Sequence, residues 1–270
     1  MASHCSLRSG GLAQDFFTPN SIQELADFLS ANTQPVIFIG LGSNLLIRDQ
    51  GFNGVIIKLT QLNALSINQS IITVSAGTTL AKLSRFAQSQ HQYGGEFLNA
   101  IPGTVGGALA MNAGAFGSEF WQYVVQVQTM SLSGEMFWRS VDEFKVNYRQ
   151  VIPKHTDEFF VSAQLIFDTE KSDQDAKQLL LKRNTSQPIG LPSCGSVFKN
   201  PPGQYAAQLI EQANLKGYCM GGACISNKHA NFIINQNKAT ASDIENLISH
   251  IQQTVKSKFN IDLETELIII

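Results

Sequence analysis

Apolar residues recur along the chain with two periods, one typical of helices and one typical of strands. The segment 19–31 begins with a Ser21–Glu24 capping-box pattern and continues with apolar residues at helical spacing, which predicts a helix. Helical spacing predicts three more helices, at 79–90, 175–184 and 242–255, the last preceded by a Ser242–Glu245 capping-box pattern. Short runs rich in β-branched and aromatic residues predict strands at 36–40, 55–59, 71–77, 124–130, 159–167 and 263–270.

Two stretches lack either period. The segment 94–117 is rich in glycine and poor in charge, too apolar for a linker and too irregular for one helix. A second glycine-bearing stretch follows Pro188. Polar residues cluster at 168–175 and predict a domain boundary. We therefore expect an α+β protein with mixed sheets and three units.

Composition narrows the classes of function. The chain has 270 residues, 43% of them hydrophobic, enough for a sizeable core. A net charge of −2 gives no basic footprint, so we expect no nucleic-acid partner. No apolar run approaches the roughly 18 residues of a membrane span, and the first ten residues lack an apolar signal region. We expect a cytoplasmic protein that does not bind membranes.

The four cysteines are Cys5, Cys194, Cys219 and Cys224. None forms a C-x-x-C pair, and the spacing of Cys219 and Cys224 fits neither a zinc ribbon nor a redox dithiol. We expect four reduced thiols and no metal site.

Two glycine segments lie next to predicted strands and are candidates for binding a phosphate group. In 40–45 (GLGSNL), glycine permits positive φ and lets backbone N–H groups converge on an anion, although a structural turn explains the same residues. The second segment is 101–115. Neither matches the Rossmann G-x-G-x-x-G pattern or the P-loop, so any nucleotide fold is a different one.

Four motifs in order resemble those of the UDP-N-acetylenolpyruvoylglucosamine reductases, also called UDP-N-acetylmuramate dehydrogenases. Segment 40–54 resembles that family's first FAD-binding loop, and 101–117 resembles its second. Segments 192–201 (PSCGSVFKNP) and 228–235 (KHANFIIN) resemble its substrate-side motifs. The resemblance covers nearly the whole chain, from about residue 8 to 270, and the compact length resembles the family's shorter form.

The resemblance implies a vanillyl-alcohol-oxidase-type FAD-binding fold of two α+β subdomains, at 1–60 and 61–168. It also implies a C-terminal α/β substrate domain at 175–262, with the last strand, 263–270, near the site. The family reaction uses non-covalent FAD and NADPH to reduce the enolpyruvyl group of a UDP-sugar in peptidoglycan synthesis. The cofactor-binding residues implied are Gly40, Gly42, Ser43, Asn44, Leu45, Pro102, Gly103, Thr104, Gly106, Gly107, Asn112, Gly114 and Ala115.

The resemblance also implies three catalytic residues. Hydride addition to the methylene carbon leaves an enolate-like species that needs charge stabilisation and one proton. Ser196 matches the family's proton donor, although by itself it fits a turn serine. Arg149 matches an arginine that meets the substrate carboxylate, but Val151 replaces the usual serine two positions later. Glu266 matches the C-terminal glutamate, and strand periodicity alone does not separate it from Glu264.

Arg183, Asn200, Lys216, Lys228 and His229 are candidate ligands of the uridine diphosphate, and His229 fits a structural histidine equally well. At the N-terminus, Arg8 and the glycines after it resemble a family motif near the flavin, with Ser9 in place of an apolar residue.

Two alternatives stay open. Another FAD-dependent oxidase or dehydrogenase of the superfamily often tethers flavin through histidine, and neither glycine segment contains one. The second alternative is a nucleotide-binding module without catalytic activity. The presence of Ser196, Arg149 and Glu266 in one chain disfavours it. We expect a monomer.

Overall fold

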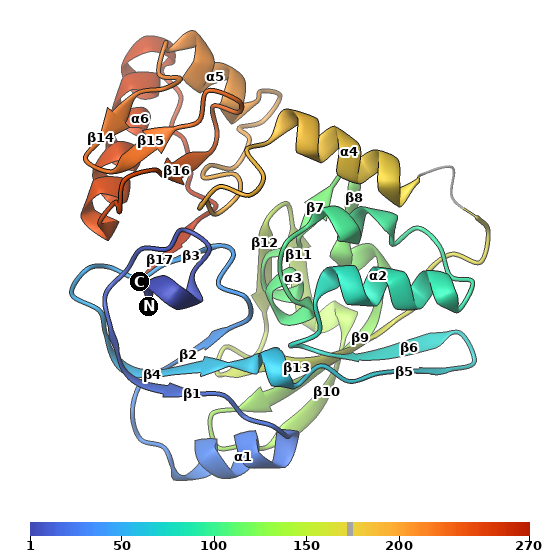
Figure 1. Ribbon diagram of the computed structural model, residues 1–270. Coiled ribbons are helices and arrows are strands. Elements are labelled where there is room, and N and C mark those ends of the chain that lie inside the picture. Colours follow the sequence, from blue (N-terminus) through green and yellow to red (C-terminus); the bar gives the residue numbers. More distant parts are fainter. Residues whose placement is uncertain (172–174) are drawn as a thin grey trace. The chain divides into compact units, whose positions relative to one another are not determined.

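The structure, a computed structural model, describes residues 1–171 and 175–270. The chain divides into two compact units that alternate along the sequence (Figure 1). The sheet unit comprises Asp15–Leu41 and Gly54–Leu181, and the terminal unit comprises Met1–Gln14, Gly42–Asn53 and Lys182–Ile270. The boundary expected at 168–175 includes residues 172–174, which lie outside the described residues. The finer division into three domains stays a prediction.

The sheet unit contains most of the strands. Its elements are β1 (Ala13–Phe17), α1 (Ile22–Ala31), β2 (Val36–Ile39), β4 (Phe52–Lys58), η2 (Leu59–Gln61), β5 (Leu65–Asn68), β6 (Ile71–Ser75), α2 (Leu80–Ser89), η3 (Glu96–Ala100), α3 (Val105–Met111), β7 (Gly114–Ala115), β8 (Ser118–Glu119), η4 (Phe120–Tyr123), β9 (Val124–Ser131), β10 (Met136–Ser140), η5 (Val141–Glu143), β11 (Phe144–Asn147), β12 (Gln150–Pro153), β13 (Glu158–Leu165) and α4 (Ala176–Ser186). The first residues of β1 and β4 and the end of α4 belong to the terminal unit.

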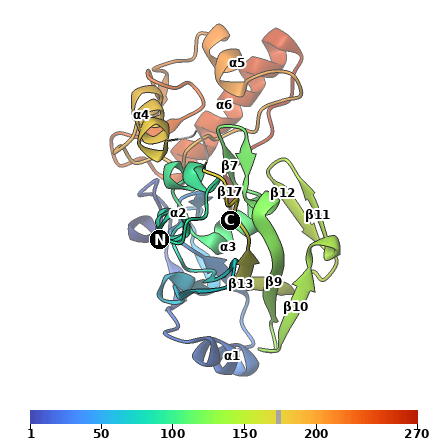
Figure 2. The ribbon, with the colours of Figure 1, turned by 90° about the vertical axis from the view of Figure 1, so that its right-hand side faces the viewer.

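A five-stranded antiparallel sheet, ordered β10-β9-β13-β6-β5, organises this unit. Helices α2 and α3 cover one face of it (Figures 1 and 2). Leu80 and Leu83 of α2 and Leu109 of α3 are buried there against Val74 and Val127 of the sheet. Burial of these large side chains provides most of the stabilisation of a helix too short to persist alone.

A smaller sheet, ordered β1-β4-β2, packs with α1 in a second cluster. The α1 N-terminus is capped as predicted, because the Ser21 side chain accepts a hydrogen bond from the Glu24 N–H at 3.1 Å. The Phe38 ring of β2 stacks on Phe159 of β13, with ring centroids 3.6 Å apart. The two sheets thus share one core within the unit.

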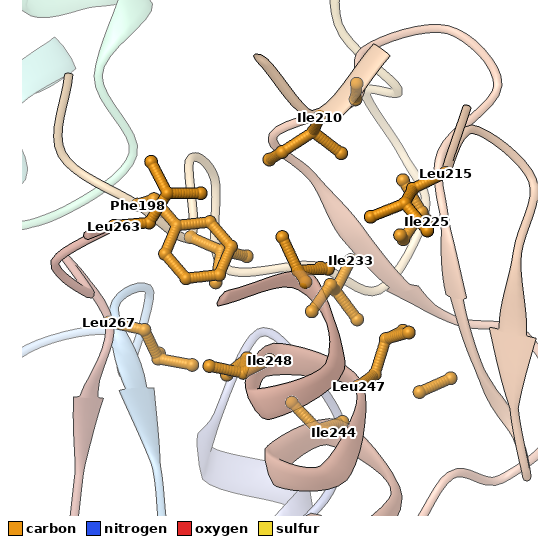
Figure 3. Packing of buried hydrophobic residues seen from close by; sticks show 14 of the residues in the cluster. Phe198, Ile210, Leu215, Ile225, Ile233, Ile244, Leu247, Ile248, Leu263 and Leu267 are labelled. Carbon is orange, nitrogen blue, oxygen red and sulfur yellow. The ribbon is translucent and has the colours of Figure 1, made fainter. Parts of the chain in front are cut away.

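The terminal unit packs around the longest helix. Its elements are η1 (Ala2–His4), β3 (Leu45–Leu46), α5 (Ala206–Gln212), β14 (Cys219–Met220), β15 (Ala223–Ile225), β16 (Ile233–Asn235), α6 (Ala241–Phe259) and β17 (Ile268–Ile269). Figure 3 shows Ile244, Leu247 and Ile248 of α6 turned toward Phe198 and Ile233, all of them buried. The apolar spacing along α6 that predicted the helix is therefore its core face.

The N-cap of α6 is Thr240, two residues before the predicted Ser242, so the Ser242–Glu245 capping box is wrong. The capping box is formed instead by Thr240 and Asp243, whose side chains each accept a hydrogen bond from the other's backbone N–H, both at 3.0 Å. Asp49 adds a cap from outside the helix, since its carboxylate accepts from the N–H groups of Ala241 and Ser242 at 2.8 and 2.9 Å.

The helices and strands predicted elsewhere are confirmed within one to three residues at most ends. The segment 94–117 proved more regular than expected, since it contains α3 as well as the short helix η3. The C-terminal strand is shorter than predicted: only Ile268–Ile269 pairs in parallel with Leu45–Leu46.

The expectation of four reduced thiols is wrong for two of them. Cys219 and Cys224 form a disulfide, whereas Cys5 and Cys194 are free and buried. The Gly221–Gly222 turn between β14 and β15 places the two residues opposite each other. Spacing alone did not reveal this, because it depends on strand register.

Candidate functional site

The second glycine segment lies against the strand end after β6. The N–H groups of Val105 and Gly106 donate to the carbonyls of Thr78 and Ala76 at 2.9 and 2.8 Å, and Leu80 N–H donates to Gly103 at 3.1 Å. A Cβ on Gly106 would lie 3.1 Å from the Ala76 Cβ, a contact tighter than normal packing. The glycine therefore favours close backbone approach, since a larger residue would require Ala76 to shift.

Gly40 is also fixed by this segment. A Cβ built on Gly40 would lie 2.2 Å from the Thr104 Oγ1, so no other residue fits between the end of β2 and the start of α3. Thr104 itself is buried. These two predicted cofactor residues are brought together.

Gly107 and Gly117 are different, because their side-chain directions are open. Gly107 is exposed, and the nearest atom to a Cβ there is the Thr104 Oγ1 at 3.9 Å. A Cβ on Gly117, whose φ is 88°, would meet no described atom within 4 Å. Bare backbone facing open space is what a phosphate-bearing ligand needs for close approach.

Arg149 occupies the two-residue turn between β11 and β12, with left-handed backbone at φ 54°. Its Nη1 donates to the Asn112 carbonyl at 3.2 Å and its Nη2 to the Gly114 carbonyl at 2.6 Å. The guanidinium also lies over the Tyr148 ring, 5.0 Å from its centroid. The half-buried cation is thus oriented by the second glycine segment. Val151, the departure from the family pattern, packs against the apolar cluster of the sheet.

Asn112 holds the same turn from the other direction. Its Nδ2 donates to the Glu119 carboxylate at 2.8 Å and to the Asn147 carbonyl at 3.2 Å, and its Oδ1 accepts from Trp121 N–H at 3.2 Å. The residue is 1% exposed, with φ at 45°. These bonds hold the side chain in the turn, and the cofactor contact that the resemblance implies for Asn112 stays a prediction. The roles of Glu119 and Asn147 have no sequence signal.

Glu96 is a buried acid that sequence reasoning missed. It is 4% exposed, and its Oε2 has no hydrogen-bond partner among the residues that the structure describes. Nearby, the Tyr123 hydroxyl donates to the Gly94 carbonyl at 3.1 Å, and burial raises the pKa of Tyr123, with Asp168 and Glu96 adding to it. A buried acceptor without a partner is a group that a ligand's hydrogen-bond donor can satisfy. A lone acid in a charge-poor segment was the available signal.

The first glycine segment continues in the terminal unit. Gly42 has φ at 65°, and a Cβ there would lie 2.0 Å from the His4 carbonyl oxygen. Its own carbonyl accepts from Ser6 N–H at 2.9 Å. Ser43 follows it, and Asn44 Nδ2 donates to the Glu266 carbonyl at 2.9 Å, just before Leu45 enters β3.

Ser196 and Glu266 lie on paired segments of this unit. Glu266 N–H donates to the Val197 carbonyl at 2.7 Å, and Phe198 and Thr265 form an antiparallel bridge. Gly195, before Ser196, has open space on its side-chain face. The half-buried Ser196 and Glu266 are therefore placed by one short pairing.

The structure separates the two glutamates that periodicity left equivalent. The Glu264 side chain is 79% exposed and forms a 2.9 Å ion pair with Lys199. Glu266 is half-buried, and its charge contributes, after burial, to raising the pKa of the buried Cys194 thiol to about 12. Its carboxyl group is therefore close enough to Cys194, two residues before Ser196, for its charge to act on that thiol.

The candidate substrate ligands all belong to the terminal unit, each with a local partner. Arg183 Nε donates to Gln187 at 2.8 Å, and burial lowers the Arg183 pKa. Lys228 Nζ donates to the Asn184 carbonyl, next to Arg183. The structure brings these two together.

The other three lie between the start of the segment before α5 and β16. The Asn200 side chain accepts from Ala206 N–H at 3.1 Å, at the start of α5. Lys216 pairs with Glu211 at 2.7 Å. Burial, and then the charge of Lys216, lower the pKa of His229.

The N-terminal motif is tightly packed within the same unit. Ser9 is 4% exposed and donates to the Ala239 carbonyl at 2.8 Å, which explains a polar residue at a buried position. A Cβ on Gly10 would lie 2.7 Å from the Ile47 carbonyl oxygen. Arg8, which precedes these two residues, is exposed.

Within residues 1–171 and 175–270, no helix is long and apolar enough to cross a membrane, and no group of three or more His, Cys, Asp or Glu side chains is arranged to bind a metal.

Comparisons with known proteins identify related families and a related fold. Residues 14–140 match the model of an FAD binding domain, and 187–270 match that of the UDP-N-acetylenolpyruvoylglucosamine reductase C-terminal domain. The chain is 46% identical to the UDP-N-acetylenolpyruvoylglucosamine reductases of Coxiella burnetii and Legionella pneumophila, over 100% of its length and 93% and 90% of theirs. The crystal structure of a UDP-N-acetylenolpyruvylglucosamine reductase from Thermus caldophilus aligns with a TM-score of 0.81 and 28% identity, over 99% of this chain and 96% of that one.

Proposed function

Because the chain belongs to the UDP-N-acetylenolpyruvoylglucosamine reductase family, we propose that it uses NADPH and FAD to reduce UDP-N-acetylglucosamine enolpyruvate to UDP-N-acetylmuramate. It is an FAD-dependent oxidoreductase, and the α+β fold with an FAD-binding domain is confirmed. The NADPH preference and the role in peptidoglycan synthesis are part of the proposal.

The residues in and beside the second glycine segment fit FAD. Gly107 and Gly117 leave backbone open to a ligand, and Glu96 offers a buried acceptor with no partner in the described part of the chain. In the proposal, 40–45 and 101–115 hold the dinucleotide, as parts of FAD-binding subdomains at 1–60 and 61–168. The substrate domain is 175–262, with 263–270 near the site.

When bound, FAD would supply the two-electron chemistry for hydride transfer between NADPH and the methylene carbon of the enolpyruvyl group. The neighbouring carbon then needs one proton. We assign that proton to the Ser196 hydroxyl, which is a weak acid and transfers a proton only to a strongly basic carbon. The orientation of Ser196 is supported by the pairing of Val197 with Glu266.

Arg149 and Glu266 stabilise the charge in this proposal. The guanidinium of Arg149 binds the substrate carboxylate, and its attraction grows as negative charge develops there. Two carbonyls of the second glycine segment orient this guanidinium, so it loses little conformational freedom on binding. Glu266, as a protonated acid or through water, hydrogen-bonds the enol. The exposed Glu264 is less suited, since it is solvated and paired with Lys199.

The observation that carries the proposal is the hydrogen bond from Glu266 N–H to the Val197 carbonyl, which brings two of the three implied catalytic residues onto adjacent backbone. Arg183, Asn200, Lys216, Lys228 and His229 are proposed to bind the uridine diphosphate. We propose that the enzyme acts as a cytoplasmic monomer, which size-exclusion chromatography with light scattering tests.

The experiment is the visible spectrum of the purified protein, followed by anaerobic additions. We expect a flavin spectrum that NADPH bleaches and the enolpyruvyl substrate restores. If the protein is denatured and filtered, yellow colour in the filtrate identifies non-covalent flavin. Absence of flavin, or recovery of the spectrum without the substrate, would overturn the proposal.

A further inference from the structure

The disulfide in the terminal unit lies on a hairpin that also carries candidate substrate ligands. Cys219 in β14 is opposite Cys224 in β15, with the two Cα atoms 4.1 Å apart. The Gly221–Gly222 turn makes this the closely spaced kind of antiparallel pair, in which two cysteine side chains face each other. Neither cysteine takes part in the reaction proposed above.

One of the two cysteine residues is exposed. Cys219 is exposed on β14, which is the edge strand of the β14-β15-β16 sheet, whereas Cys224 is 6% exposed. Thiol–disulfide exchange requires an attacking or attacked sulfur that a small reagent can reach. We therefore expect the exposed Cys219 to form the mixed disulfide with the reagent, and the buried Cys224 to attack it and complete the exchange.

The hairpin is short, so the crosslink contributes much of what holds its strands together. β14 has only two residues. The residues just before it also bond to β15: Ile225 N–H donates to the Tyr218 carbonyl at 2.9 Å, and Gly217 N–H donates to the Ile225 carbonyl at 3.0 Å. β16 and α6 also support this hairpin, since Gly222 N–H donates to the Asp243 carboxylate at 3.3 Å and the Tyr218 ring stacks on His250. β14 is nevertheless a short edge strand, so without the crosslink it can separate from β15 more easily.

Candidate substrate ligands follow directly from the open end of the hairpin. Lys216 precedes Gly217 on one strand, and Ser226 follows Ile225 on the other. The Ser226 hydroxyl accepts from the N–H groups of Lys228 and His229 at 3.1 and 3.3 Å. The spacing of the two strands therefore sets where Lys216 lies relative to Lys228 and His229.

We propose that Cys219 and Cys224 form a reversible dithiol–disulfide pair, and that its oxidation tightens binding of the uridine diphosphate substrate by fixing the hairpin end that carries Lys216, Lys228 and His229. The second half of this statement rests on the proposed function.

The chemistry balances with a disulfide oxidant as co-reactant. The Cys219 thiolate attacks one sulfur of the oxidant and expels a thiolate, giving a mixed disulfide. The Cys224 thiolate then attacks the Cys219 sulfur and expels the second thiol. The two cysteine thiols lose two electrons and two protons, which appear on the two thiols formed from the oxidant. Excess dithiol reverses both steps.

The first test measures the redox pair without reference to substrate. The FAD-loaded protein is equilibrated in mixtures of reduced and oxidised dithiothreitol, alkylated, and digested for mass spectrometry. We expect one two-electron transition for Cys219 and Cys224. Cys5 and Cys194 should stay thiols throughout, because both are buried and burial raises the pKa of each. A pair that never bonds, or a bond that survives the fully reduced mixture, overturns the proposal.

The second test measures the dissociation constant of UDP-N-acetylglucosamine enolpyruvate without NADPH, by calorimetry, in the two extreme mixtures. We expect binding about fivefold weaker after reduction, or more. Equal affinity in both states overturns the coupling. Absence of binding in either state overturns the proposed function as well, while the first test still stands by itself.

Variants separate the bond from other effects of the reductant. Cys219→Ser with Cys224→Ala removes both sulfurs, and Cys219→Ser alone leaves the buried Cys224 packing intact. Both proteins should bind the substrate as reduced wild type does, in either mixture. A reductant effect that persists in these variants contradicts the assignment to this pair.

Discussion

The guanidinium of Arg149 and the backbone of Asn112 are hydrogen-bonded, with Nη1 donating to the Asn112 carbonyl at 3.2 Å. The Asn112 side chain in turn donates to the carbonyl of Asn147, two residues before the arginine, at 3.2 Å. The contact is thus reciprocal. The glycine segment positions the arginine, and the asparagine in that segment positions the turn on which the arginine sits.

Asn112→Gly should slow reoxidation of the flavin by substrate while leaving its reduction by NADPH near normal. Glycine tolerates the left-handed backbone at φ 45° but lacks the side chain that bonds Glu119, Asn147 and the Trp121 N–H. We expect about a tenfold slower second half-reaction, from misplacement of Arg149. The free energy of unfolding should fall by about 2 kcal/mol. Stopped-flow absorbance and denaturant melts measure the two effects. An equal loss in both half-reactions would point to general damage instead.

Ser196→Ala should divide the two half-reactions more sharply. Loss of a proton donor slows the step that it serves by about 100- to 10,000-fold, without affecting a step that needs no proton from it. Anaerobic NADPH should therefore bleach the flavin at the normal rate, and the enolpyruvyl substrate should fail to restore it. Normal rates in both halves would remove Ser196 from its assigned role.

Glu266→Gln and Glu264→Gln form a matched pair two residues apart. The exposed Glu264 contributes a surface ion pair with Lys199, for which about 0–1 kcal/mol is usual, so its variant should retain nearly full turnover. The half-buried Glu266 is paired through its backbone with the Ser196 segment. Its variant should slow the half-reaction with substrate by about 100-fold or more. Steady-state kinetics of both proteins decide it. Similar losses in the two would show that the structure does not discriminate the glutamates.

Asp49→Asn should destabilise the protein at neutral pH but not in acid. Hydrogen bonds from the Ser242 side chain and then from backbone N–H groups lower the pKa of Asp49. Because the native pKa lies below the unfolded value of about 3.9, the carboxylate stabilises the fold above that pH. That stabilisation is lost as pH falls through the native pKa.

Solvent screens this exposed group, so we expect about 0.5–1 kcal/mol at pH 7. Thermal melts of both proteins from neutral pH to below about pH 4 measure the difference. The difference should shrink in acid, and one that stays constant would contradict the capping role. Asp243 also titrates with a lowered pKa, but it does so in both proteins.

Gly107→Ala tests the cofactor position separately from catalysis. The apoprotein should be as stable as wild type or slightly more so, since the new Cβ has room and alanine favours a helix over glycine by about 0.5–1 kcal/mol. FAD binding should weaken by about tenfold, or 1.4 kcal/mol, if the dinucleotide approaches this backbone. Flavin fluorescence titration of the apoprotein measures it.

Gly106→Ala is the control for that variant. Its Cβ would lie 3.1 Å from the Ala76 Cβ, so we expect a lower melting temperature for its apoprotein. Unchanged FAD affinity in Gly107→Ala would show that the cofactor does not approach the backbone of α3 at this position.

The sequence by itself determined the features that depend on neighbours in the chain. The Ser21 cap and the apolar spacing of α6 are local, because a helix brings residues three and four apart onto one face. The glycine segments were visible for the same reason, since a residue without a Cβ changes the local backbone. The motifs on them identified the family and, through it, FAD.

Tertiary structure decided whatever depends on partners far away in the chain. The partner of Glu264 is Lys199, the second cap of α6 is Asp49, and the turn of Arg149 is held by Asn112. The disulfide joins cysteines only five residues apart, but it too depends on a pairing, because the two-residue turn places Cys219 opposite Cys224. Periodicity along one strand does not encode which residue stands opposite it, because turn geometry and packing of the core make that choice.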